Sequence, residues 1–103
     1  MTAQGNHPAA AEVSRPLRIR NRLGLHARAA VKFVQLAAKF KSEIKVRKDG
    51  QEVNGKSIMG LLTLVAALGM EIVVAGEGAD AEEAVAALAA LVDRGFDEGV
   101  EAP

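Results

Sequence analysis

The sequence predicts a two-layer α/β sandwich of the α+β class, with helices covering one face of an antiparallel sheet. Strand-like and helix-like periodicities follow one another in the order β-α-β-β-α-β-α. The dipeptide Asp49-Gly50, typical of a type I′ hairpin turn with two positive φ angles, separates two of the strands. A chain of 103 residues is long enough for one domain with a modest core, but not for two.

The first half of the chain is expected to contain three strands and a helix. Residues 1–15 show no periodicity, so we expect a flexible tail there. Alternating apolar and basic residues predict a strand in 17–22, and helical spacing predicts a helix of about three turns in 29–40. Alternation returns in 43–48, and 51–54 is the return strand of the hairpin. The residues expected to face the core are Leu17, Ile19, Ala30, Phe33, Val34, Ala37, Phe40, Ile44 and Val46.

The second half is expected to contain two helices on either side of one buried strand. Residues 57–68 have helical spacing, and 71–76 are rich in apolar residues, as in a buried strand. Asp80 and Glu83 resemble the start of a capping box, so we expect the last helix to begin there and to stop at Gly95. The residues expected on the inner faces of the helices are Ile58, Leu61, Leu62, Val65, Val85, Leu88 and Val92.

Composition excludes several classes of protein. The absence of cysteine excludes a disulfide scaffold, a thiol nucleophile and a thiolate metal site. The longest apolar run, AVAALAALV (84–92), is much shorter than a membrane span. The N-terminal residues lack the charged and apolar regions of a secretory signal. We therefore expect a soluble, cytoplasmic protein that does not contact membranes.

The net charge is zero, but the two halves of the chain differ strongly. Residues 1–50 carry eleven Lys and Arg against three Asp and Glu, a balance of +8, and residues 51–103 carry two against ten, a balance of −8. This asymmetry predicts either a basic face for an acidic or phosphorylated partner or simply solvated charges. Nucleic acid is not expected as a partner, because Phe33 and Phe40 belong to an apolar helix stripe rather than a stacking platform.

The stretch GQEVNGKS (50–57) matches the phosphate-loop pattern G-x-x-x-x-G-K-[ST]. A phosphate loop joins a parallel strand to a helix. Here Gly50 is expected in a hairpin turn, and 51–54 are expected to pair as a strand. No later strand ends in the aspartate that would hold magnesium. The match is therefore interpreted as a coincidence.

His26 is the main candidate for chemistry, because it lies after the first predicted strand and at the start of the first helix. The positive end of the helix dipole disfavours the imidazolium, so we expect a neutral, nucleophilic ring near neutral pH. A phosphoryl group on that ring would meet free backbone N–H groups and the guanidinium of Arg28. An ordinary polar helix cap explains the same spacing, and spacing alone does not decide between the two.

Other candidate sites have less support. His7 lies in the predicted tail, where we expect an unstructured residue. No second histidine or carboxylate stands at ligand spacing from His26, so no metal site is predicted. Nothing in the sequence supplies both the orienting acid and the oxyanion hole of a hydrolase.

Three motifs, GLHAR, NGKSIMGLLTL and G-x-EIVV-x-x-x-G-x-DAEEA, occur in this order. Together they resemble the HPr family, the phosphocarrier proteins of the phosphoenolpyruvate-dependent phosphotransferase system. The resemblance covers residues 16–95 and implies a four-stranded sheet of order 1-4-2-3. It also implies a domain spanning 16–96, between the tail of residues 1–15 and an acidic C-terminal tail, 97–103.

The resemblance assigns roles to individual residues. His26 matches the histidine that accepts a phosphoryl group on Nδ1 from Enzyme I and passes it to a IIA-type protein. Arg28 matches the arginine that balances the charge of the phosphate, and Ser57 matches a serine that HPr kinase/phosphorylase modifies in many bacteria. Residues implied in partner docking are Ala27, Ile58, Met59 and Leu62. Plain core packing is the alternative for the last three residues.

The sequence departs from the family at Ala29, where the family usually has proline. Proline in a first helical turn stiffens the entry to the helix without loss of a hydrogen bond. Alanine is compatible with a helix, so we expect a slightly looser site that still functions.

The resemblance implies a phosphoryl carrier rather than an enzyme. It implies no cofactor, phosphoenolpyruvate as the upstream donor through Enzyme I, and a monomer. The segment LVDRGFDEG (91–99) favours the nitrogen-type regulatory branch of the family over sugar transport. Two alternatives are a regulatory binding module acting through Ser57 alone, which the presence of His26 disfavours, and a small anion- or nucleic-acid-binding domain.

Overall fold

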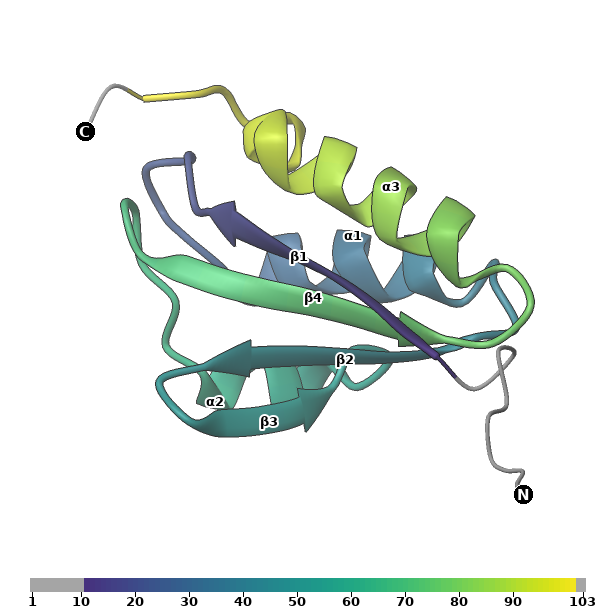
Figure 1. Cartoon of the computed structure of the whole chain (residues 1–103). Helices are drawn as coiled ribbons and strands as arrows, with labels where there is room; N and C mark the ends of the chain where they lie inside the picture. The colour runs from purple at the N-terminus through teal and green to yellow at the C-terminus, as the bar shows by residue number, and fades with distance from the viewer. Residues whose placement is uncertain (1–10, 102–103) are drawn as a thin grey trace, which may run out of the picture.

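A computed structural model describes residues 11–101. In this part of the chain, a four-stranded antiparallel sheet carries three α-helices on one face (Figure 1). The strands are β1 (Glu12–Arg18), β2 (Glu43–Lys48), β3 (Gln51–Asn54) and β4 (Glu71–Glu77). The helices are α1 (Ala27–Ala37), α2 (Ile58–Thr63) and α3 (Ala81–Asp93), followed by a single 3₁₀ turn, Gly95–Asp97. The sheet order is β1-β4-β2-β3, so the predicted fold class, element order and sheet order are confirmed.

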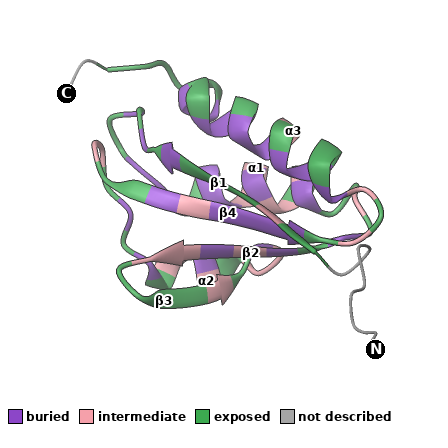
Figure 2. Cartoon of the chain, viewed as in Figure 1, coloured by how far each residue is buried: buried purple, intermediate pink, exposed green. Residues whose placement is uncertain are grey.

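The core lies between the sheet and the helices. The strand β4 pairs with β1 on one side and β2 on the other, which places Ile72 opposite Leu17 and Val74 opposite Val46. Figure 2 shows the buried residues on the sides of α1 and α3 that face the sheet. The predicted core residues that are buried are Leu17, Ile19, Ala30, Phe33, Ala37, Ile44, Val46, Leu61, Val85, Leu88 and Val92.

The hairpin between β2 and β3 has the predicted geometry. Asp49 and Gly50 both have positive φ angles, of 52° and 80°, as a type I′ turn requires. The following residues pair with β2 as a strand, and the Nζ of Lys56 donates to the backbone carbonyl of Phe40 at 2.7 Å. Because Gly50 and Lys56 are engaged in the fold, the segment is not a phosphate loop, as predicted.

The first strand begins earlier than the sequence predicts. Residues 12–15 pair with residues 74–77 of β4, so the prediction of a tail through residue 15 is wrong at this point. Residues 1–10, including His7, lie outside the described part of the chain. The strand also ends at Arg18 rather than running on to residue 22. Pro16 is tolerated because β1 is an edge strand.

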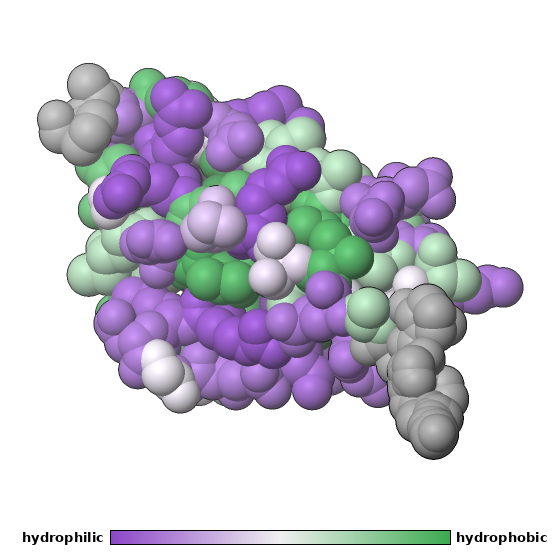
Figure 3. Space-filling model, viewed as in Figure 1, coloured by the Kyte–Doolittle hydropathy of each residue, from purple (hydrophilic) through white to green (hydrophobic). Residues whose placement is uncertain are grey.

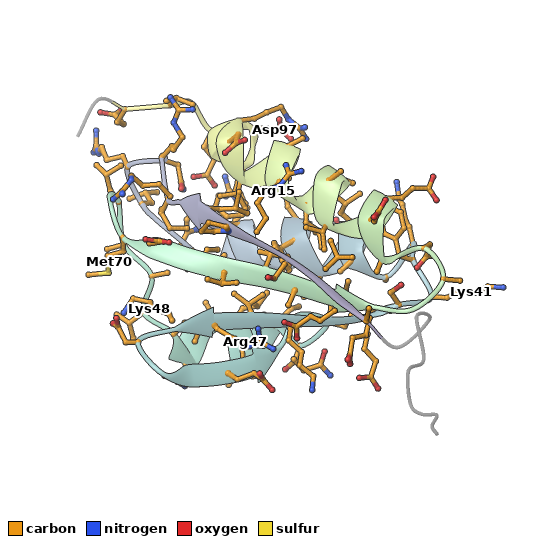
Figure 4. All side chains as sticks on the ribbon, viewed as in Figure 1. Arg15, Lys41, Arg47, Lys48, Met70 and Asp97 are labelled. Carbon is orange, nitrogen blue, oxygen red and sulfur yellow. The ribbon has the colours of Figure 1, made fainter. Side chains whose placement is uncertain are left out.

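Contacts across the uncovered face of the sheet explain this early start. The guanidinium of Arg47 donates two hydrogen bonds to the carboxylate of Glu12, at 3.0 and 2.6 Å, and a third to Glu52 at 2.7 Å. The hydrogen bonds from Arg47 lower the pKa of Glu12 below its usual value. Figure 4 shows Arg47 on this face, and Figure 3 shows that hydrophilic atoms surround a more apolar centre there.

The second helix is shorter than the predicted helix of 57–68. It ends after Thr63, and Val65 has a left-handed φ of 50°. Val65 is 73% exposed, so its prediction as an inward-facing residue is wrong. The chain instead buries Leu64 and Ala66, because the left-handed residue between them ends the helix.

The capping box predicted at the start of α3 does not form. Asp80 is the N-cap residue, but its side chain caps no amide of the helix. Its carboxylate accepts hydrogen bonds from the Lys41 amide at 2.8 Å, the Ser42 amide at 2.9 Å and the Ser42 hydroxyl. Asp80 therefore ties the start of α3 to the loop between α1 and β2. The helix ends at Asp93, close to the predicted stop at Gly95.

Residues 97–101 are not a loose acidic tail. Gly95, Phe96 and Asp97 have successive left-handed φ angles of 66°, 53° and 64°, which turn the chain back on itself after α3. Phe96 is fully buried, and its carbonyl accepts a hydrogen bond from the Nζ of Lys32 at 2.9 Å. The amide of Glu101 then donates to the carbonyl of Arg20 at 2.8 Å. These contacts hold the segment against the loop before α1, so the predicted domain boundary at residue 96 is wrong.

Candidate functional site

His26 is the N-cap residue of α1, as predicted. Its backbone is extended, with φ −80° and ψ −179°, and its carbonyl accepts the first helical hydrogen bond from Ala30. The Nδ1 atom accepts a hydrogen bond from the backbone amide of Arg28 at 3.3 Å. About a quarter of the His26 side chain is exposed (27%). One ring nitrogen therefore lies at the positive end of the helix and within reach of an incoming group.

The loop that carries His26 is fixed by backbone contacts. Gly24 adopts a left-handed φ of 68°, and its amide donates to the carbonyl of Asn21 at 3.1 Å. The next amide, of Leu25, donates to the carbonyl of Ala66 at 2.9 Å, and the Leu25 side chain is buried. The histidine is thus held between α1 and the loop after α2.

The second ring nitrogen of His26 meets a carboxylate from the other end of the chain. Its Nε2 lies 2.6 Å from Oε2 of Glu98, while Oε1 of Glu98 accepts a hydrogen bond from Nδ2 of Asn21 at 2.9 Å. Burial by itself raises the pKa of Glu98, but the hydrogen bonds from Asn21 and His26 outweigh it and hold this pKa below its usual value. Glu98 is therefore a carboxylate near neutral pH.

A shallow surface pocket of about 750 Å³ surrounds His26. Its lining residues are Arg22, Leu23, His26, Ala27, Arg28, Glu98 and Glu101. The structure therefore places the predicted residues Ala27 and Arg28 beside His26. Within residues 11–101, no carboxylate forms an ion pair with Arg28, so its guanidinium is available to a bound anion.

The other predicted site residues form a separate region at α2. Ser57 is the N-cap residue of this helix, and its hydroxyl oxygen accepts a hydrogen bond from the Gly60 amide at 3.0 Å. Met59 is 72% exposed and Ile58 is partly exposed, so neither is a core residue. Leu62 is half-buried and packs against the core. None of these four residues lines the pocket around His26.

The sequence does not predict that Glu98 and Asn21 belong to the site. Glu98 is 72 residues from His26, in the segment 97–103 that was expected to be an acidic tail outside the domain. Asn21 was expected inside a strand, but it is a fully buried loop residue. The only local signal was Gly95, which permits the left-handed turn that returns the chain to the site.

Two further observations concern the described residues as a whole. Between residues 11 and 101, no group of three or more His, Cys, Asp or Glu side chains could hold a metal ion. The same part of the chain contains no helix of the length and apolarity that crossing a membrane requires.

This small α/β sandwich presents a partly exposed histidine ring at a helix N-terminus, in a surface pocket that another protein can reach. Comparison with known proteins gives the family. The family described as "PTS HPr component phosphorylation site" matches residues 13–94. The chain belongs to the HPr family, the phosphocarrier proteins of the phosphotransferase system.

Individual relatives cover nearly the whole domain. The phosphocarrier protein HPr of Neisseria meningitidis is 53% identical over 83 residues, which are 81% of this chain and 93% of the relative. The phosphocarrier protein NPr of Shewanella violacea is 42% identical over 84% of this chain and 96% of its own length. The crystal structure of an HPr from Thermoanaerobacter tengcongensis is 44% identical, has a TM-score of 0.82, and is matched over 85% of this chain and 99% of its own.

The comparisons do not favour the predicted monomer. A second crystal structure from Thermoanaerobacter tengcongensis, 48% identical with a TM-score of 0.66, is described as an HPr dimer. It is matched over 78% of this chain and 92% of its own. The family therefore includes dimers, and the prediction of a monomer does not follow from membership in it.

Proposed function

We propose that this protein accepts a phosphoryl group on Nδ1 of His26 from phosphohistidine Enzyme I and passes it to a IIA-type protein. The observation that carries the proposal is the environment of Nδ1. This atom accepts a hydrogen bond from the Arg28 amide, so it bears a lone pair rather than a proton. His26 also lines the shallow pocket, which is open to another protein.

The transfer needs only one bond to form and one to break. The Arg28 amide releases its hydrogen bond to Nδ1, whose lone pair then attacks the phosphorus of the donor phosphohistidine. The donor N–P bond breaks with its electron pair returning to the donor ring. Phosphoryl transfer of this kind depends on positioning and on charge stabilisation rather than on covalent help from the protein. The Arg28 amide and guanidinium are the groups of this chain that would stabilise the transferred phosphate.

Docking of both partners is proposed to use the exposed apolar side chains near the two helix N-termini. Met59 and Ile58 on α2 are exposed, and Leu23 and Ala27 lie in the lining of the pocket. Exposed apolar residues bordered by arginines are typical of a surface that binds another protein. We place these encounters in the cytoplasm, where both partners of the proposed transfer act.

Regulation through Ser57 is proposed in addition. The Ser57 hydroxyl lies at the start of α2, adjacent in the chain to the docking residues Ile58 and Met59. A phosphate there adds about −1.5 to −2 charges beside the proposed docking surface. A relative described as the Bacillus subtilis catabolite repression HPr, Crh, is 44% identical over 78% of this chain and 94% of its own length.

Incubation with Enzyme I and phosphoenolpyruvate, followed by intact-mass measurement, tests the carrier function. We expect one added phosphate that is labile in acid and stable in alkali, and none on His26→Ala. His7→Ala is the matched control, because it removes the other histidine and should label fully. Full labelling of His26→Ala, or loss of labelling in His7→Ala, would contradict the proposal.

A further inference from the structure

Glu98 reaches His26 through an unfavourable backbone turn that the fold maintains. Residues other than glycine rarely adopt the left-handed region, because the Cβ atom crowds the following carbonyl oxygen, and both Phe96 and Asp97 adopt it. The turn persists because the Phe96 ring is fully buried and Lys32 binds the Phe96 carbonyl. The ion pair of Arg94 with Asp97, at 2.8 Å, also lies within the turn. The position of Glu98 is therefore fixed by tertiary contacts.

The carboxylate of Glu98 is itself held in one orientation by Asn21. This asparagine is fully buried, and its Nδ2 donates to Oε1 of Glu98 and, at 2.8 Å, to the carbonyl of Gly24. If the Asn21 amide group were flipped, its oxygen would face the Glu98 carboxylate and the Gly24 carbonyl, which can only accept hydrogen bonds. Only the orientation in which Nδ2 donates to both is therefore compatible with these contacts. Oδ1 of Asn21 has no hydrogen-bond partner within residues 11–101. The side chain thus leaves one buried acceptor unsatisfied while it orients Glu98.

The contacts on the two ring nitrogens define one tautomer of His26. Nδ1 accepts a hydrogen bond from the Arg28 amide, so it carries no hydrogen in this arrangement. Nε2 lies 2.6 Å from an ionised carboxylate oxygen, which can only accept. The neutral ring therefore has its hydrogen on Nε2 and its lone pair on Nδ1. In proteins, the hydrogen bond made by one imidazole nitrogen commonly determines whether the other nitrogen carries a hydrogen or a lone pair.

We propose that Glu98 is a positioning residue for phosphoryl transfer: it fixes the Nε2–H tautomer and the ring orientation of His26, with Asn21 holding Glu98 in place. The inference rests on the proposed function of His26. When the Nδ1–P bond forms and the donor N–P bond breaks, Nε2 keeps its hydrogen and the ring acquires positive charge. That charge develops next to the Glu98 carboxylate, which stabilises it without a proton transfer.

The test uses the full chain and compares Glu98→Ala with Asp93→Ala. Both variants remove one carboxylate near the C-terminal end of the described chain, but only Glu98 lines the pocket and contacts the His26 ring. Nitrogen-15 NMR of the unphosphorylated protein reports the tautomer, and the rate of phosphate uptake from Enzyme I reports transfer. We expect Glu98→Ala to populate the Nδ1–H tautomer and to slow uptake by about tenfold or more, as for a lost charge-assisted hydrogen bond. Asp93→Ala should leave both quantities close to the wild-type values.

Glu98→Gln keeps an acceptor oxygen without the charge. We expect it to preserve the Nε2–H tautomer and to recover part of the rate. Wild-type tautomer and rate in Glu98→Ala, or equal losses in Asp93→Ala, would overturn the proposal. If the wild-type protein takes up no phosphate, the proposed function is wrong, and Glu98 has no role in transfer. This holds even if the NMR spectrum shows the expected tautomer of His26.

Discussion

The carbonyl oxygen of Ala66 leaves no room for a side chain at Gly24. A Cβ atom built on Gly24 would lie 2.5 Å from that oxygen, and the φ of Gly24 is already left-handed, at 68°. The same carbonyl accepts the hydrogen bond from Leu25 that fixes the loop in front of His26. The close approach of these two loops therefore sets the position of the histidine.

Gly24→Ala should destabilise the protein by about 2–5 kcal/mol, the sum of a left-handed alanine and a backbone clash. Gly50→Ala is the matched control, because Gly50 also has a positive φ but no atom within 4 Å of a built Cβ. We expect the control to lose only about 1–2 kcal/mol. Chemical denaturation of both variants provides the measurement, and equal losses would show that the contact with Ala66 is unimportant.

Arg28→Ala should slow phosphoryl transfer to His26 by about 10- to 150-fold, the equivalent of one hydrogen bond to a charged group. Its stability should change by less than about 0.5 kcal/mol, because the side chain is exposed and forms no ion pair within residues 11–101. Arg15→Ala removes the same charge from the exposed edge of β1, where Figure 4 shows it, and serves as the control. Stopped-flow or quench measurements with Enzyme I that give equal rates for both variants would contradict the role of Arg28.

Ser57→Asp should weaken binding to Enzyme I several-fold at low salt, and less at high salt. The carboxylate adds a negative charge beside Ile58 and Met59, facing a partner surface expected to be acidic. Gln51→Glu adds the same charge at the hairpin end of β3 and should bind like the wild type. Calorimetric titrations at two salt concentrations decide the matter. If Ser57→Asp binds Enzyme I as tightly as the wild type at low salt, Ser57 acts only as a helix cap.

Asp80→Asn should lower stability at neutral pH, and the difference from wild type should vanish in acid. The hydrogen bond from the Ser42 hydroxyl, followed by that from the Lys41 amide, lowers the pKa of Asp80. A carboxyl with a lowered folded-state pKa contributes stability above its unfolded pKa, near 3.9, and loses it as the pH falls through the folded value.

Thermal unfolding of both proteins between neutral pH and about pH 2 measures this difference, which should shrink as the pH falls from the usual aspartate pKa toward the lowered folded-state value. Asp93→Asn is the control, because Asp93 forms no hydrogen bond or ion pair through its side chain within residues 11–101. A constant difference between Asp80→Asn and wild type across the whole pH range would exclude the electrostatic explanation.

Local patterns were sufficient for most of the fold. The alternation around Ile44 and Val46 and the turn at Asp49 predict the hairpin, because register and turn chemistry are properties of neighbouring residues. The start of β1 was not predictable in this way. Glu12 joins the sheet through pairing with β4 and through Arg47, neither of which leaves a periodic signal near Glu12.

The candidate site was predictable only where it is local. His26 and Arg28 are two residues apart, and the physics of a helix N-terminus suggests their joint role. Glu98 depends on a left-handed turn at Phe96 and Asp97, and residues other than glycine rarely adopt that conformation. The segment was therefore expected to be an acidic tail, and only the tertiary structure connects this carboxylate to the histidine.

The two ends of the described chain differ in how they accept an attached domain or a tether. The chain enters β1 at Glu12, and the strand runs for seven residues, about 23 Å, before it turns toward the loop of His26. Figure 1 shows that this entry point and the end of α3 lie on opposite sides of the molecule. At the other end, Glu101 lines the pocket itself. Fusion or surface immobilisation ahead of β1 should leave the histidine open to large protein partners, whereas attachment after Glu101 should obstruct their approach.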